Sequence, residues 1–181
     1  MIHADQIAKA LAAYLERHPA DAPRLAPLSA ALAGTGDVTS RKTFAGHATV
    51  SAIVVNGAHE VLHIRHNALK IWLCPGGHLE SDDTNLVDAA AREVDEETGI
   101  PADRLAIADD IPVDIDVHPI PANDTKREPG HQHYDLRFVF TTTDDAPAVR
   151  LQAEEVHDFA WLPLAELQPE HLRDRVTRVL G

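Results

Sequence analysis

Cysteine, basic side chains and long apolar runs are scarce in this chain of 181 residues. The single cysteine, Cys74, excludes an internal disulfide and any cysteine-rich zinc site. No apolar run approaches the roughly 20 residues that a helix needs to cross a bilayer. The first residues also lack the basic-then-apolar order of a secretory signal. We therefore expect a soluble, cytoplasmic protein without membrane partners.

The charge balance limits the class of partner. Acidic residues outnumber basic ones by 29 to 16, and the formal net charge is -13. Because nucleic acids are held largely by Lys and Arg side chains that release counterions from phosphates, bulk nucleic acid binding is not expected. A small-molecule phosphorylated substrate is compatible with this charge if metal ions bring positive charge to a cluster of carboxylates.

The length suits one domain with a small appendage. Apolar residues recur at helical spacing over residues 7–15 and again over residues 25–32. We expect residues 1–42 to be an N-terminal helical appendage that packs on the rest of the chain or forms a homodimer contact. Residues 43–181 then form the main domain.

The main domain shows strand and helix patterns in turn. Residues 48–55 and 60–65 predict two strands, which a turn at Asn56 and Gly57 joins as a hairpin. A Pro-Gly-Gly turn follows, and then a helix predicted over residues 84–98. The remaining predicted elements are strands over residues 111–117, 134–142 and 159–162 and a closing helix over residues 164–180.

Three glutamates share one face of the central helix. Glu93, Glu96 and Glu97 stand at i, i+3 and i+4, so their carboxylates lie within one turn. They precede Gly99, the expected C-cap, where the helix macrodipole disfavours acidic side chains by roughly 0.3–1 kcal/mol each. The face is either a solvated acidic surface or a site where Mg²⁺ supplies the missing positive charge. The neighbouring Arg92 favours the second interpretation, because its guanidinium can orient a carboxylate.

Residues 77–100, GHLESDDTNLVDAAAREVDEETGI, resemble the Nudix box. That box reads Gly, five residues, Glu, seven residues, then Arg-Glu-apolar-x-Glu-Glu-x-Gly-apolar. Its second half is matched at every specified position, by Arg92, Glu93, Val94, Glu96, Glu97, Gly99 and Ile100. In its first half Asp83 stands where the family has Glu, and one extra residue precedes the arginine. We expect Asp83 or Thr84 to cap the helix, with no metal role for Asp83.

The resemblance implies a Nudix-type α/β/α sandwich around a mixed β-sheet, in an enzyme that hydrolyses a nucleoside diphosphate linked to another moiety. It also implies that Glu93, Glu96 and Glu97 bind Mg²⁺ or Mn²⁺, and that Arg92 orients them. Arg92 and Glu93 thus belong to the expected catalytic set. Many family members add a late glutamate as ligand or general base, and Glu155 stands at the expected place, with Glu154 as the alternative.

Histidines add a second group of candidates. His131, His133 and Asp135 alternate along a predicted strand and therefore point to one face. Such a row can bind metal or phosphate, or can consist of ordinary hydrogen-bonded residues. We expect His133 and Asp135 to contact substrate together with Gly77 and His78 of the turn before the helix.

Two alternatives share this fold. An enzyme like isopentenyl diphosphate isomerase uses a metal site of His and Glu, but it needs a catalytic Cys in the turn just before a His. Here Gly77 precedes His78, and Cys74 is displaced. A silent binding or regulatory domain usually loses the charged box residues, which are intact here. The sequence shows no nucleotide fingerprint or aromatic pair that identifies the substrate.

Overall fold

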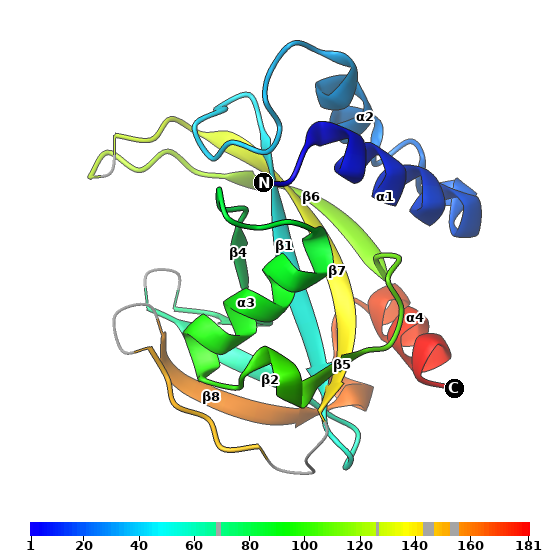
Figure 1. Ribbon diagram of the computed structural model, residues 1–181, viewed down its shortest axis with the longest axis vertical. Helices are drawn as coiled ribbons and strands as arrows, with labels where there is room; N and C mark the ends of the chain where they lie inside the picture. Colours follow the sequence, from blue (N-terminus) through cyan, green and yellow to red (C-terminus); the bar gives the residue numbers. More distant parts are fainter. Residues whose placement is uncertain (68–69, 126, 143–146, 153–155) are drawn as a thin grey trace.

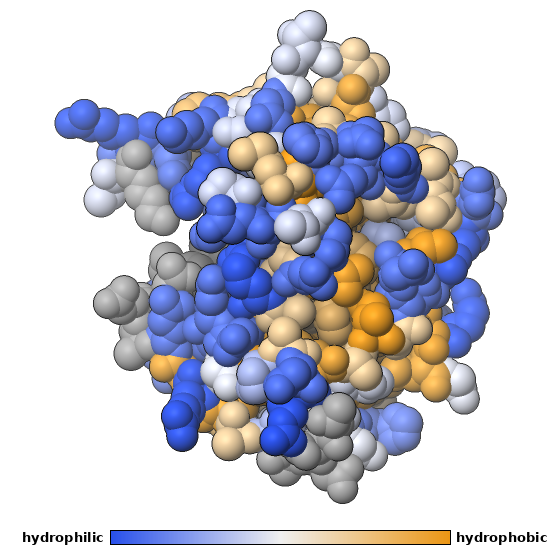
Figure 2. All heavy atoms as spheres, in the orientation of Figure 1, coloured by the Kyte–Doolittle hydropathy of each residue, from blue (hydrophilic) through white to orange (hydrophobic). Residues whose placement is uncertain are grey.

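The computed structural model describes residues 1–67, 70–125, 127–142, 147–152 and 156–181. In chain order the elements are α1 (Ala4–Arg17), η1 (Pro19–Asp21), α2 (Ala26–Ala33), β1 (His47–Val55), β2 (Glu60–His66), β3 (Trp72–Leu73), β4 (Gly76–His78), α3 (Leu86–Thr98), η2 (Ala102–Arg104), β5 (Leu105–Ile107), β6 (Asp114–Ile120), β7 (His131–Thr142), β8 (Val156–Pro163), η3 (Leu164–Glu166) and α4 (Glu170–Leu180). No helix in these ranges is long and apolar enough to cross a membrane. Hydrophilic residues dominate the surface seen in Figure 2, while hydrophobic ones gather between α3 and α4.

Within the described ranges, eight strands form one mixed sheet around the parallel pair β1 and β7 (Figure 1). This pair is in register from His47 opposite His133 to Val55 opposite Thr141. The other edge of β1 pairs with β4 and, at its last residue, with β2. The other edge of β7 is likewise divided between β6 and β5. The centre of the sheet therefore joins strands that lie far apart in the sequence.

The predicted hairpin is correct only at its turn. The side chain of Asn56 closes this turn by accepting two backbone N–H groups. The pairing between β1 and β2, however, consists of Val55 opposite Val61, next to the turn. The strands diverge because β4 occupies the same edge of β1 nearer the start of that strand, with Gly76 opposite Ser51. β2 pairs along its length with β8 instead.

Element boundaries also differ from prediction. Asn85 is the N-cap of α3, because its side chain accepts a backbone N–H in the first turn of the helix. The capping role predicted for Asp83 or Thr84 is therefore wrong. The closing helix begins only after Pro169, since a proline lacks the backbone N–H that a continuous helix requires. The short strand β5 was not predicted.

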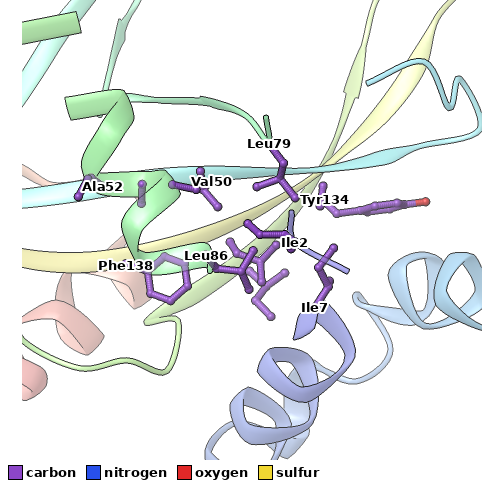
Figure 3. Packing of buried hydrophobic residues seen from close by; sticks show 14 of the residues in the cluster. Ile2, Ile7, Val50, Ala52, Leu79, Leu86, Tyr134 and Phe138 are labelled. Atoms are coloured by element: carbon purple, nitrogen blue, oxygen red, sulfur yellow. The ribbon is translucent and has the colours of Figure 1, made fainter. Parts of the chain in front are cut away.

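Helices cover both faces of the sheet. On one face Val50 and Ala52 of β1 lie near Leu86 of α3 in the main core (Figure 3). On the other face Ile53 belongs to a second core cluster with Val176 of α4. This arrangement of helix, mixed sheet and helix confirms the expected α/β/α sandwich.

The N-terminal helices pack into the main core and are also held by charge. Tyr14 of α1 is fully buried, and its hydroxyl lies 3.2 Å from the Asp114 carboxylate of β6. Arg24 and Arg175 donate to the same carboxylate at 2.7 and 2.8 Å. Both guanidinium groups and the Tyr14 hydroxyl also contact Asp21. The network thus ties α1 and the following segment to β6 and α4.

This network predicts a large effect for Asp114→Asn. Asp114 is 1% exposed, and among the described residues the substitution leaves Arg24 and Arg175 with Asp21 as their remaining carboxylate partner. We expect the free energy of unfolding to fall by about 3 kcal/mol, the lower end of the cost of breaking a buried ion pair. Urea denaturation measures this change.

The control is Asp5→Asn, which removes an exposed pair with Lys9. Exposed pairs of this kind contribute less than about 1 kcal/mol. Similar small effects in the two variants would contradict a role of the buried network in stability.

Candidate active site

Glu93 and Glu97 of the central helix α3 lie beside Gly76 and Gly77, the two glycines at the start of β4. The backbone N–H of Gly76 donates to Oε2 of Glu97 at 3.0 Å. A Cβ atom on Gly77 would lie 2.6 Å from each carboxylate oxygen of Glu93. The missing side chain at Gly77 therefore gives the Glu93 carboxylate room beside the sheet, and the backbone of Gly76 holds Glu97.

One guanidinium joins the loop before α3 to the carboxylates on it. Arg92 donates through Nε and Nη2 to the two oxygens of Asp83 at 2.9 and 3.1 Å. Its Nη1 donates to Glu93 at 3.0 Å and to Glu96 at 2.9 Å, and Nη2 also reaches the carbonyl oxygen of His78. Asp83 is therefore the bidentate partner of Arg92, although an extra residue separates the two in the box.

The carboxylates around Arg92 carry more negative charge than its single guanidinium offsets. Glu93 and Glu97 are 8% and 3% exposed, respectively. Burial raises the pKa of Glu93 to about 7, against the lowering effect of Arg92, and the charges of Glu96 and Glu80 raise it further. Carboxylates crowded in this way have the donor chemistry that a hard divalent cation prefers. The residues present therefore fit Mg²⁺ or Mn²⁺.

A cleft of about 640 Å³ lies beside these carboxylates. Thr49 and Ser51 form part of its lining, and Ile53 follows them on the same side of β1. Ile53 also belongs to the cluster packed under α4. One side of β1 therefore changes from polar to apolar along the cleft, and Ile53 both lines the cleft and packs in the cluster under α4.

The structure brings most of the predicted site residues to this cleft. Those that line it are Gly77, His78, Glu93, Glu96, Glu97, His133 and Asp135. Arg92 contacts the carboxylates, as described above. Glu155 and its alternative Glu154 lie outside the described residues, so their proposed role as base stays a prediction.

Asp135 accepts hydrogen bonds from side chains that also line the cleft. Its carboxylate accepts from the hydroxyls of Thr49 and Ser51 at 3.1 and 2.8 Å and from Nε of Arg137 at 3.0 Å. Sequence reasoning missed these three partners. Alternation of Thr49 and Ser51 with apolar residues was the available signal.

Five histidines form a cluster of which His78, His118 and His133 line the cleft. Rings of His47, His78, His118 and His131 lie with their centroids 4.8–5.6 Å from the ring of His133. Burial, followed by the neighbouring imidazoles, lowers the pKa of His133 to about 3. Burial also lowers the pKa of His47. Both rings are therefore neutral at pH 7.

The glycine pair predicts a contrast in stability. A Cβ on Gly76 would lie 2.5 Å from the backbone oxygen of Val50, whereas the nearest atoms to one on Gly77 are those of the Glu93 carboxylate, at the end of a side chain. We expect Gly76→Ala to lower the free energy of unfolding by about 1–3 kcal/mol. Gly77→Ala should cost less, because its close contact is with the end of a side chain and not with the backbone. Denaturant unfolding measures both values.

Gly36→Ala is the control, because its Cβ would meet Thr43 at an ordinary 3.4 Å. The explanation is wrong if Gly77→Ala destabilises the protein as much as Gly76→Ala.

Two curated relatives match the chain in part. A probable DHNTP pyrophosphohydrolase of Lactococcus lactis subsp. cremoris is 39% identical over 80 residues, which are 44% of this chain and 45% of that protein. Phosphatase NudJ of Escherichia coli K12 is 48% identical over 60 residues, which are 33% of this chain and 39% of NudJ. The chain thus matches less than half the length of these relatives.

Solved structures share the fold. An Ap4A hydrolase of C. elegans, in a binary complex, has a TM-score of 0.56 and 18% identity, covering 74% of this chain and 96% of its own. The NUDIX domain of Shewanella oneidensis NrtR complexed with ADP ribose has a TM-score of 0.51 and 20% identity, covering 84% and 98%. A family model described as the NUDIX domain matches residues 46–180. Because this match spans most of the chain, the protein belongs to the Nudix family.

Proposed function

We propose that this protein is a divalent-metal-dependent pyrophosphohydrolase that cleaves the diphosphate linkage of a nucleoside diphosphate derivative. The observation that carries the proposal is the convergence of Glu93, Glu96 and Glu97 on one cleft, with Arg92 as the cation that contacts Glu93 and Glu96. The pyrophosphohydrolase and phosphatase names of the curated relatives support the same reaction class.

The three glutamates would hold Mg²⁺ or Mn²⁺. When bound, such an ion offsets charge on the phosphoryl oxygens and lowers the pKa of the attacking water. Arg92 keeps Glu93 and Glu96 in one orientation through charge-assisted hydrogen bonds. The Gly76 N–H fixes Glu97 in the same way. The carboxylates are thus positioned before substrate binds.

The size and lining of the cleft suit a small phosphorylated molecule. Its volume of about 640 Å³ lies within the range of roughly 300–1,000 Å³ that small-molecule sites occupy. His78 and His133 line it beside the glutamates and can donate hydrogen bonds to phosphate oxygens. Glu155 is proposed as the base, from its position in the sequence alone.

Cys74 does not favour the isomerase alternative. Burial raises the pKa of its thiol to about 12, so the thiol stays protonated at neutral pH. The intact carboxylate group likewise disfavours a silent binding domain.

Metal binding gives the first test. Mg²⁺ at about 100 times its Kd adds about 2.7 kcal/mol to the stability of the folded state, which should raise Tm by several degrees. Glu97→Gln should abolish this shift and lower kcat at least about 100-fold. Asp95→Asn, an exposed change on the same helix, should keep both properties. A full Mg²⁺ shift in Glu97→Gln would remove Glu97 from the metal site.

Isotope labelling tests the reaction itself. In ¹⁸O water, with Mg²⁺ and a panel of nucleoside diphosphate derivatives, we expect ¹⁸O in a phosphate-containing product, because water attacks phosphorus. Cys74→Ala should remain active. Turnover without label incorporation, or a folded but inactive Cys74→Ala, would support isomerisation. Absence of turnover across the panel despite Mg²⁺ binding would support a silent domain.

A further inference from the structure

We propose a second metal site in the same cleft, in which His47 of β1, His78 of β4 and His133 of β7 together bind one first-row transition ion such as Zn²⁺. The residues of this site are different from the three glutamates of α3. Its ligands are ring nitrogens, whereas those of the α3 site are carboxylate oxygens.

The sheet brings the three rings together. His47 lies opposite His133 in the parallel register of β1 and β7. His78 lies opposite Thr49, which is on the same side of β1 as His47. One ligand nitrogen from each histidine lies within 4.8 Å of the others. Nitrogens bonded to zinc at about 2.0–2.1 Å in a tetrahedral site lie about 3.4 Å apart, so small ring rotations complete the geometry.

His47 presents a bare lone pair to the cluster. The residue is 1% exposed, and its Nδ1 lies 3.3 Å from the carbonyl oxygen of Thr43. A carbonyl can only accept, so Nδ1 carries the hydrogen and Nε2 of the neutral ring is unprotonated. Across the described part of the chain, this buried Nε2 finds no hydrogen-bond partner. A buried acceptor left in this way costs about 1–3 kcal/mol, which a bound cation would offset.

The neighbouring His118 and His131 also have Nδ1 close to an oxygen acceptor. Nδ1 of His131 lies 2.9 Å from the carbonyl oxygen of Pro129, and its Nε2 is 3.2 Å from Nε2 of His133. Nδ1 of His118 lies 3.0 Å from the Asp116 carboxylate. Metal-ligating histidines usually donate their second N–H to a carbonyl or carboxylate, which fixes the orientation of the ring. His131 is therefore positioned either to bind the ion as a fourth ligand or to hold the His133 ring in its orientation.

The ligand type decides which ion each site prefers. Imidazole nitrogen suits Zn²⁺, Cu²⁺, Ni²⁺ and Fe²⁺, whereas Mg²⁺ prefers oxygen ligands. Excess Mg²⁺ should therefore fill the α3 carboxylates without displacing Zn²⁺ from the histidines. This difference allows the two sites to be measured separately.

The test is calorimetric titration of the chelator-treated protein with Zn²⁺ in excess Mg²⁺. We expect one Zn²⁺ per chain. His78→Gln and His133→Gln should each weaken binding at least about 10-fold. These two residues are half-buried, so their variants are expected to fold, which thermal unfolding checks. His157→Gln is the control, because His157 is exposed on β8 and does not line the cleft.

Glu97→Gln separates this proposal from the proposed hydrolase. Unchanged Zn²⁺ binding in that variant supports the histidine site, even if Mg²⁺-dependent turnover is lost. Loss of Zn²⁺ binding in Glu97→Gln would assign the ion to α3 and overturn the proposal. The proposal also fails if wild-type protein binds no Zn²⁺ in excess Mg²⁺, or if folded His78→Gln and His133→Gln bind it as wild type does.

Discussion

The carboxylate face of α3 depends on the guanidinium of Arg92. It is bonded to Glu93 and Glu96 on the helix and to Asp83 in the preceding loop, so one cation holds three mutually repelling groups. The same side chain reaches the carbonyl oxygen of His78 at the end of β4. Loop, strand and helix are therefore fixed together, and the glutamates keep one orientation without having to be ordered by substrate.

One side of β1 serves two purposes, since it contributes both to the cleft and to the core. Near its start, His47, Thr49 and Ser51 are polar and line or border the cleft. Near its end, Ile53 packs in the cluster beneath α4. Because side chains alternate along a strand, this change of character leaves the opposite side of β1 free to remain apolar against α3. The core and the cleft therefore share one strand and meet at Ile53, which lines the cleft and packs in the cluster beneath α4.

The two proposed cation sites differ because they come from different layers of the fold. A helix places side chains three and four residues apart on one face, which groups the glutamates of α3 within a single turn. A sheet places residues of separate strands side by side, which groups His47, His78 and His133. Oxygen ligands are thereby grouped on the helix and nitrogen ligands on the sheet, and each group has its own preference among metal ions.

The sequence by itself determined the features that depend on neighbouring residues. The i, i+3, i+4 spacing placed the three glutamates on one face, and Gly99 ends α3 in the left-handed conformation, with φ of 66°. Tertiary structure decided what depends on distant residues: the pairing of β2 with β8, the bond of Asp83 to Arg92 across an extra residue, and the meeting of His47 with His133. The physical reason is that helical periodicity is encoded within a few residues, whereas strand partners and register are set by backbone hydrogen bonds and packing between segments that local pattern does not relate.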